Sequence, residues 1–478
     1  MLNALKRKTQ NVPLPAKAAS AYAVSSILQK GIAFLTLPLF TRLLTTEQYG
    51  QFTIYLSWES IVCIFITLNL AYGSFAPAMA KFESERDAYI ASVEGICLAL
   101  AAIFVAVYLS FADLWNMLFD LPTPLIIVMV LEIVGQYGIA LWCGKKQFEY
   151  KYKGVVALNL ANAAIAPLVA LLLVLNTNEK GYAYILGIAI TNIVLGGAVF
   201  VFNLVQGRRV FEKRFWKYAL AFNIPLLAYY LSQVVFNQSD RLMINAIVGP
   251  DAAALYGVAY NIAMVLTFLL NAINNSYIPW LYGKIKVGAQ SENKPVATAI
   301  AGLLAALVLM VDWLAPELVF ILGGSRYAKA AYVIPPIAMS LLLLFYAQLF
   351  INVEFYYEQK RHLVFASIGA AVLNILLNAW LIPIFGFVAA GYTTFASYIV
   401  FAGSNYLALK QTLSIQGKAQ DAYDLHQLLA ILGVFVVLGF VGMALYPYVL
   451  LRAIALAALA VVGLIRRKQI MTLVEKIR

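Results

Sequence analysis

The sequence has few charged residues and few residues that carry out catalysis. Asp, Glu, Lys and Arg make up 12% of its 478 residues, about half the share in a soluble globular protein. It has only 3 cysteines and 2 histidines. Cys63, Cys97 and Cys143 lie within apolar runs, without paired or metal-ligand spacing. These shortages argue against disulfides, a metal site and a His-based catalytic set, and no cofactor is expected.

The sequence has many long apolar runs. Hydrophobic residues make up 63% of the chain and the mean hydropathy is +0.83. Apolar runs of roughly 20 residues, enough for a helix to cross about 30 Å of hydrocarbon, recur from end to end. The alternation typical of barrel strands is absent. The sequence therefore predicts an all-α integral membrane protein with about 14 transmembrane helices.

The expected spans follow the apolar runs along the chain. They are 20–44, 51–71, 89–111, 124–143, 155–175, 182–205, 218–248, 253–282, 296–322, 331–353, 363–385, 388–409, 428–445 and 449–465.

The placement of basic residues predicts the orientation, because Lys and Arg are retained in short cytoplasmic loops. With the amino end in the cytoplasm, 27 of the 34 Lys and Arg residues fall in cytoplasmic segments. The exceptions are Lys30, Arg42, Lys180, Arg241, Arg326, Lys329 and Arg452. Both termini are therefore expected to be cytoplasmic. The net charge of +12 is spread over these short segments, so it indicates topology and no nucleic-acid partner.

The short loops favour transport over catalysis. Membrane enzymes place catalytic groups in long loops or soluble domains, whereas the longest connections here are 72–88 and 410–427, both on the expected cytoplasmic side. The chain is therefore not expected to be an enzyme. A membrane glycosyltransferase or polymerase is the less favoured alternative.

Two weak internal repeats suggest a duplicated transporter, whose substrate site would lie between the repeats. Tyr49-Gly50 matches Tyr256-Gly257 at an interval of 207 residues, and Gly181-Tyr182 matches Gly391-Tyr392 at 210. Six spans per repeat give two parallel six-helix lobes and a terminal helix pair. The expected division is 1–207 (spans 1–6), 208–419 (spans 7–12) and 420–478 (spans 13 and 14).

Three stretches carry a resemblance to a known family. They are FTRLLTTEQYGQFTIY from Phe40, FNQSDRLMINAIVG from Phe236 and NILLNAWLIPIFGFVAAGYTTFASYI from Asn374. With them, essentially the whole chain resembles the polysaccharide transporters of the multidrug/oligosaccharidyl-lipid/polysaccharide exporter superfamily, specifically the Wzx-type O-antigen flippases.

This resemblance implies a function as well as a fold. Such a protein moves an undecaprenyl-diphosphate-linked oligosaccharide from the cytoplasmic to the periplasmic leaflet of the bacterial inner membrane. It does so by alternating access, coupled to an ion gradient, for O-antigen, capsule or exopolysaccharide synthesis. The implied partners are this lipid-linked substrate, membrane lipids, a polysaccharide polymerase and a chain-length regulator.

Lys30 lies deep in the first expected span, roughly 15 to 20 Å from either surface, too deep to reach the headgroups. Tyr22, Gln29 and Lys30 share one face of that helix. Such a polar stripe is expected to line a cavity, where Lys30 would attract the diphosphate of a lipid carrier. The alternative is a structural ion pair between Lys30 and Glu59 of the second span.

Glu132 is a third deep charge, without an obvious local partner in the sequence. A lone intramembrane carboxylate could carry a proton for ion coupling. It could equally be neutral and bonded to a neighbouring hydroxyl. Glu94 and Asp312 lie closer to the ends of their spans and are expected to be interfacial.

A second polar stripe, on the seventh expected span, includes Tyr230, Asn237, Asp240 and Arg241. Because Asp240 and Arg241 are adjacent, they are expected to reach different partners. Arg241 is the second candidate for the diphosphate, and Asp240 is placed to compete for it or to bind the coupling ion. We expect this stripe and that of the first span to face one cavity.

The eighth expected span adds amide groups at Asn271, Asn274 and Asn275. They could bind sugar hydroxyls or bond between helices, and the sequence does not separate these readings. A drug or cation exporter of the same superfamily remains the alternative within transport. The lysine and arginine that accompany the acids favour an anionic substrate.

Overall fold

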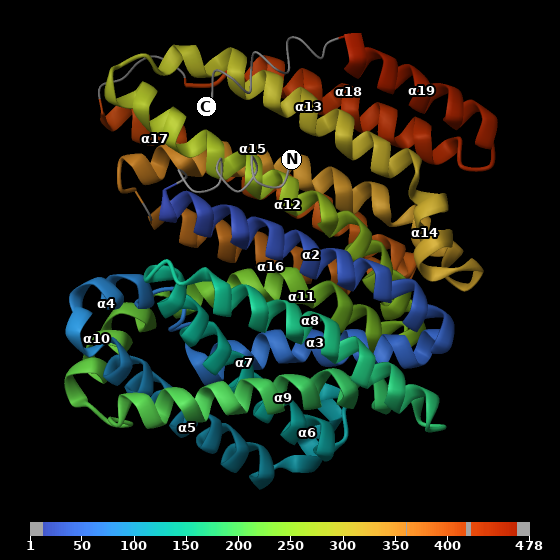
Figure 1. The fold of residues 1–478 in the computed structure, drawn as a ribbon. Coiled ribbons are helices and arrows are strands. Elements are labelled where there is room, and N and C mark those ends of the chain that lie inside the picture. Colours follow the sequence, from blue (N-terminus) through green and yellow to red (C-terminus); the bar gives the residue numbers. More distant parts are fainter. Residues whose placement is uncertain (1–12, 360, 417–421, 466–478) are drawn as a thin grey trace, which may run out of the picture. The chain divides into compact units, whose positions relative to one another are not determined.

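The computed structural model describes residues 13–359, 361–416 and 422–465, and these ranges contain helices and turns but no strand (Figure 1). The expected all-α class is therefore confirmed. The chain forms two compact units, Met1–Val234 (unit 1) and Val235–Arg478 (unit 2), and the division falls inside helix α11 (Leu227–Ile247). The expected division at residues 207 and 419 stays a prediction.

Unit 1 contains nine α-helices and the first part of α11, among its described residues. They are α2 (Leu14–Leu43), α3 (Thr46–Thr67), α4 (Phe75–Lys81), α5 (Arg86–Ser110), α6 (Ala112–Phe119), α7 (Thr123–Phe148), α8 (Tyr152–Leu175), α9 (Lys180–Gly207) and α10 (Lys213–Asn223). Short 3₁₀ turns are η1 (Glu83–Glu85) and η2 (Ile224–Leu226).

Unit 2 continues from the second part of α11. Its helices are α12 (Pro250–Lys286), α13 (Asn293–Trp313), α14 (Ala315–Gly323), α15 (Ile334–Tyr356), α16 (Arg361–Phe385), α17 (Val388–Ile415), α18 (Leu425–Ala444) and α19 (Val449–Ile465). The 3₁₀ turns are η3 (Gln290–Glu292) and η4 (Ser325–Tyr332).

Each expected span coincides with one main helix, with two exceptions: 218–248 falls on α10, η2 and α11, and 296–322 falls on α13 and α14. Within the described ranges, 11 helical segments are long and apolar enough to cross a membrane. The remaining expected spans are α3, α17 and α19. Of these, α19 has 17 residues, and α3 and α17 carry several polar residues along their length.

Local sequence signals explain where the helices begin and end. Thr45 and Gln48 form a reciprocal capping box at the start of α3. Pro250 opens α12 directly after Gly249, whose φ of 118° suits glycine. Pro225 lies in η2 and interrupts the expected seventh span. The expected span 296–322 is likewise divided between α13 and α14 at Leu314.

In unit 1, α9 packs against both α7 and α8, and close glycine contacts fix its distance from α7. A Cβ added at Gly196 would lie 2.4 Å from the carbonyl carbon of Gly135 on α7. Small residues allow such close approach between membrane helices. This contact brings Glu132 of α7 to the level of Asn192 of α9.

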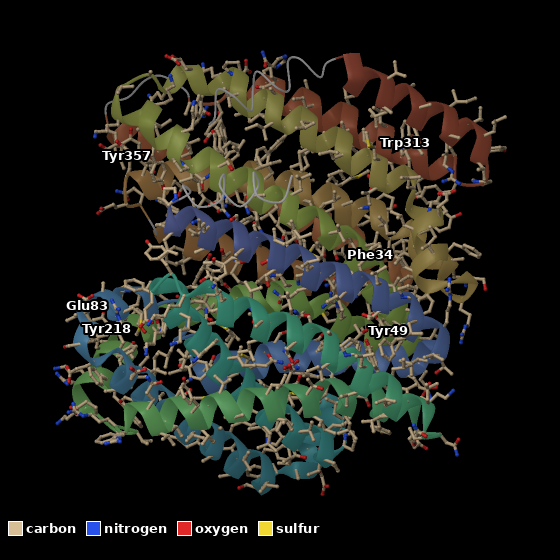
Figure 2. All side chains as sticks on the ribbon, in the orientation of Figure 1. Phe34, Tyr49, Glu83, Tyr218, Trp313 and Tyr357 are labelled. Atoms are coloured by element: carbon tan, nitrogen blue, oxygen red, sulfur yellow. The ribbon has the colours of Figure 1, made fainter. Side chains whose placement is uncertain are left out.

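Ion pairs gather at one end of unit 1. In Figure 2, Glu83 and Tyr218 mark this end and Tyr49 marks the other. Lys145 of α7 pairs with Asp87 of α5. At the same end, Glu85 accepts hydrogen bonds from Arg209 and Arg214. These pairs join α5, α7 and the segment around α10 at the end expected to face the cytoplasm.

Candidate functional site

Glu132 lies at the centre of a polar cluster inside unit 1. Its carboxylate accepts hydrogen bonds from the Tyr55 hydroxyl of α3 and the Asn192 amide of α9, each at 2.7 Å. Gln136, one turn along α7, donates a third at 3.2 Å. Glu132 is 1% exposed. Hydrogen bonds from side chains on three helices therefore take the place of water around this buried carboxylate.

The same cluster contains a second carboxylate. Glu59 of α3 is buried and accepts a hydrogen bond of 3.0 Å from the Gln136 amide, which also serves Glu132. Asn162 of α8 completes the cluster by donating to Asn192 at 2.9 Å. We call these six residues the Glu132 network. It joins α3, α7, α8 and α9 and holds two carboxylates against one shared amide.

The network bears on one alternative raised by the sequence. Among the described residues Glu59 makes no ion pair, and its carboxylate is engaged by Gln136. Lys30 is exposed on α2. The ion pair between Lys30 and Glu59 is therefore absent from this structure, which leaves the cavity-lining interpretation of Lys30 as the prediction.

Unit 2 encloses a second network around Asp240 of α11. The Asp240 carboxylate accepts hydrogen bonds from Tyr256 of α12 at 2.5 Å, Thr394 of α17 at 2.6 Å and Asn378 of α16 at 2.7 Å. Asp240 is 2% exposed. As in unit 1, one tyrosine hydroxyl and one amide reach a buried carboxylate from neighbouring helices.

A further ring of residues orients these donors. Asn374 accepts from Asn378 at 3.2 Å, and its own amide donates to Thr394 at 3.3 Å. Ser239 donates to Asn374 at 2.9 Å. The Asp240 network therefore comprises Ser239, Asp240, Tyr256, Asn374, Asn378, Thr393 and Thr394, with Thr393 donating to Asn378.

The chemistry of the Asp240 network suits a hard cation or a proton. Carboxylate, amide and hydroxyl oxygens are the ligands that alkali and alkaline-earth cations accept. The network offers oxygens of all three types. Among the described residues, no group of three or more His, Cys, Asp and Glu side chains could hold a metal ion.

Arg241 has a separate environment, as its position next to Asp240 predicts. It is buried, and its guanidinium donates to Gln238 at 2.7 Å. It also lies 4.1 Å from the ring centroid of Tyr260, a cation–π contact. Tyr260 in turn donates to Asn237 at 3.4 Å. Arg241, Tyr260 and Asn237 thus form one polar group beside the Asp240 network.

The other candidates are spread along their helices. On α2, which packs against α8, Gln29 donates to Ser25. The buried Tyr22 hydroxyl has no hydrogen-bond partner in the described ranges. The centroid of the Tyr230 ring lies 5.8 Å from the centroid of the Tyr229 ring.

The asparagines of α12 divide between the two readings left open by the sequence. Asn271 and Asn275 are exposed. Asn274 accepts a hydrogen bond of 2.8 Å from Asn352 of α15. The interhelical reading therefore holds for Asn274, and the sugar-binding reading stays a prediction for the other two.

Several residues of the two networks were not singled out from the sequence. Tyr55, Gln136 and Asn192 are scattered over three helices, so no local pattern groups them. Asn374 and Asn378 did carry a signal, because two asparagines four residues apart share a face of an otherwise apolar helix. Glu94 and Asp312, expected near the interface, are fully buried within their units.

Comparison with known proteins identifies the family of this chain and its fold. The family model for polysaccharide biosynthesis proteins matches residues 16–283, more than half of the chain. A Haemophilus influenzae protein described as an uncharacterized membrane protein is 23% identical over 380 residues, covering 75% of this chain and 88% of the relative. The Lsg locus putative protein 1 of the same organism is 23% identical over 367 residues, covering 74% and 88%.

Solved structures show the same architecture at low identity. The lipid II flippase MurJ, in an inward closed conformation, has a TM-score of 0.69 at 11% identity and covers 94% of this chain and 99% of its own. An inward-facing multidrug resistance MATE family transporter has a TM-score of 0.60 at 14% identity, covering 82% and 96%. This chain is a multi-pass membrane protein with the fold of these transporters, and it belongs to the polysaccharide biosynthesis protein family.

Proposed function

We propose that this protein is a flippase that moves undecaprenyl-diphosphate-linked oligosaccharide units from the cytoplasmic to the periplasmic leaflet of the bacterial inner membrane. The family supports a role in polysaccharide synthesis, and the fold supports a transporter. The product would enter O-antigen, capsule or exopolysaccharide synthesis. A polymerase and a chain-length regulator are the partners that such a pathway would supply.

One structural observation carries the coupling part of this proposal. Each unit buries a carboxylate that accepts hydrogen bonds from three side chains, at least two of which lie on other helices. A buried charge is a poor way to stabilise a fold, because desolvation costs several kcal/mol before any attraction is counted. Intramembrane acids are instead typical of proton and ion pathways. We propose that Glu132 and Asp240 take up and release the coupling ion.

The substrate diphosphate would be attracted by cations on the polar stripes of α2 and α11. Lys30 is the candidate on α2 and Arg241 on α11, with Gln29, Asn237, Tyr22 and Tyr230 beside them. Lysine attracts phosphate as a point charge, whereas arginine can bind two phosphate oxygens at once. Asn271 and Asn275 would offer amide groups to the sugars.

A reconstituted transport measurement tests this function. Proteoliposomes would receive a fluorescent undecaprenyl-diphosphate-linked oligosaccharide, and its appearance in the opposite leaflet would be followed under imposed proton or sodium gradients. We expect gradient-dependent movement by the wild type. Glu132→Gln and Asp240→Asn should each remove the gradient dependence. Glu179→Gln is the matched control, because it makes the same replacement of a carboxylate by an amide at an exposed residue outside both networks.

Two outcomes would contradict the proposal in different ways. If the wild type moves cationic dyes but no lipid-linked oligosaccharide, the protein is a drug exporter of the same fold. If it moves the oligosaccharide and both network variants keep the full gradient dependence, the substrate stands and the coupling sites do not.

A further inference from the structure

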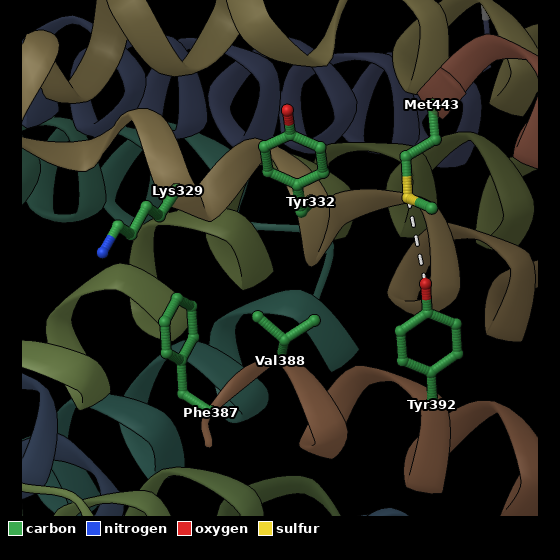
Figure 3. Close-up of a pocket in the computed structure, with 6 residues that line it drawn as sticks. All are labelled: Lys329, Tyr332, Phe387, Val388, Tyr392 and Met443. Atoms are coloured by element: carbon green, nitrogen blue, oxygen red, sulfur yellow. Dashed lines mark hydrogen bonds between the residues drawn. The ribbon is translucent and has the colours of Figure 1, made fainter. Parts of the chain in front are cut away.

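A pocket of about 360 Å³ opens in unit 2 between η4, the start of α17 and the end of α18 (Figure 3). It has no part in either polar network. Its lining consists of Lys329, Tyr332, Phe387, Val388, Tyr392 and Met443.

The walls of the pocket are fixed by the turn and contacts around α17. Gly386, with a φ of 68°, turns the chain between α16 and α17 and places Phe387 and Val388 at the start of α17. One turn later, the Tyr392 hydroxyl donates to the sulfur of Met443 on α18 at 3.8 Å (Figure 3). The pocket is therefore built from three elements, with a direct link between α17 and α18.

The lining is almost entirely hydrocarbon, and a single cation lies at its edge, with the Lys329 ammonium pointing away from the other lining residues (Figure 3). Aromatic rings, a valine and a methionine form the walls, and Lys329 is the only charged residue among them. Within the described ranges Lys329 makes no ion pair. Glu317, an acid on the preceding helix α14, is held by two hydrogen bonds from Arg452. The positive charge of Lys329 is therefore available to a ligand.

The position of the pocket at the ends of two helices limits the kind of ligand that it can bind. Val388 is the first residue of α17 and Met443 lies in the last turn of α18. These helix ends lie where membrane-crossing helices leave the hydrocarbon and meet lipid headgroups. An anion next to an apolar chain is the chemistry that matches the lysine and the walls.

From these features we propose that the pocket binds an anionic phospholipid, with one acyl chain against the aromatic walls and the phosphate at Lys329. A volume of about 360 Å³ is near the lower limit for ligand pockets, so it fits part of one chain and not a whole lipid-linked oligosaccharide. A sugar is a poorer match, because no amide or carboxylate lines the pocket. This proposal does not depend on the proposed flippase function.

Native mass spectrometry of the purified full-length protein tests this site. Delipidated protein would be mixed with phosphatidylglycerol or phosphatidylethanolamine at equal concentrations, and the fraction carrying lipid measured. We expect the wild type to retain about threefold more phosphatidylglycerol, the scale of a partly exposed ion pair. Lys329→Ala should abolish that preference, and Lys329→Glu should reverse it.

A second substitution tests the apolar part of the pocket, and a control tests the charge. Val388→Trp should fill the pocket and reduce the retention of both lipids. Lys180→Ala removes a lysine at the start of α9 in unit 1, so it should leave retention unchanged. Unchanged retention in all the Lys329 and Val388 variants would overturn the proposal. Displacement of the lipid by a soluble acidic oligosaccharide would also overturn it, by assigning the pocket to a sugar.

Discussion

Single side chains determine whether the buried carboxylates are tolerated. Glu132 and Asp240 each accept a hydrogen bond from a tyrosine, Tyr55 and Tyr256 respectively. A buried acceptor that loses a donor is penalised by about 1 to 3 kcal/mol, and more when it is charged. The tyrosine hydroxyls should therefore contribute to stability out of proportion to their size.

Tyr55→Phe should lower the free energy of unfolding by about 1 to 3 kcal/mol, because Glu132 loses one of its donors. Thermal unfolding of the purified protein in detergent would measure the change. Tyr137→Phe is the matched control, since the Tyr137 hydroxyl is buried in the same unit without a hydrogen-bond partner among the described residues. It should leave the unfolding temperature equal or slightly raised. Equal losses in the two variants would show that the Tyr55 bond contributes nothing specific.

Lys30→Ala should abolish surface polysaccharide in cells at normal protein levels, and Lys30→Arg should retain part of it. The reason is that attraction to a diphosphate depends on charge more than on shape. Because Glu59 is engaged by Gln136, the double variant Lys30→Ala with Glu59→Ala should not recover activity. Immunoblotting for the polysaccharide and for the protein gives both measurements. Full activity of Lys30→Ala would remove Lys30 from the substrate path.

The sequence predicted some of these residues and missed others for a physical reason. Asp240, Glu132 and Arg241 were found because a charge in an apolar run is conspicuous. The separate surroundings of Asp240 and Arg241 also followed from their adjacency. Tyr55 and Asn192 were missed because neutral polar residues are common in membrane helices. Only the packing of three helices shows that they meet one carboxylate.

At the scale of whole helices, the close contact between α7 and α9 depends on two glycines. Gly196→Ala would place a Cβ 2.4 Å from the Gly135 carbonyl group, and backbone cannot move aside as a side chain can. We expect a loss of about 1 to 3 kcal/mol, measured by thermal unfolding. Gly197→Ala on the next position is the control, since nothing lies within 4 Å of its added Cβ. A similar loss in both variants would contradict this account of the contact.

The ion pair between α14 and α19 gives a pH-dependent contribution. Partial burial raises the pKa of the Glu317 carboxyl, but the hydrogen bonds and charge of Arg452 outweigh it and hold the pKa below 4.5. A lowered folded-state pKa stabilises the protein above the unfolded pKa, and this stability disappears as the pH falls through the folded value. Glu317→Gln should therefore lower the unfolding temperature at pH 7. The difference from the wild type should shrink below pH 4.5. A difference independent of pH would assign the effect to packing.

Helix positions were predictable to a greater degree than helix continuity. Each apolar run that predicted a span falls on helical structure, since a helix must remain apolar to cross the bilayer. The interruptions at η2 and at Leu314 were not predicted. Pro225 lies within η2 and Pro316 lies two residues after Leu314, and both prolines occur inside mostly apolar runs. Hydropathy alone therefore does not reveal where the backbone departs from a regular helix.

For the whole molecule, the orientation in the membrane is the most direct prediction. Fusions of green fluorescent protein after residue 415 and residue 478 should fluoresce, and alkaline phosphatase at the same points should be inactive, because basic segments stay in the cytoplasm. A fusion at Asn176, between α8 and α9, should give the reverse pattern. Phosphatase activity at 415 or 478 would mean that an expected span does not cross.

The Asp240 network joins residues that are synthesised far apart in time. Asp240 receives hydrogen bonds from Asn378 and Thr394, which follow it by 138 and 154 residues. A ribosome adding about 5 to 20 residues per second reaches Thr394 roughly 8 to 30 seconds after Asp240. The Glu132 network is different, because Tyr55 precedes Glu132 and Asn192 follows it by only 60 residues. Newly inserted α11 must therefore keep its carboxylate in contact with water, the insertion machinery or Tyr256 until α16 and α17 arrive.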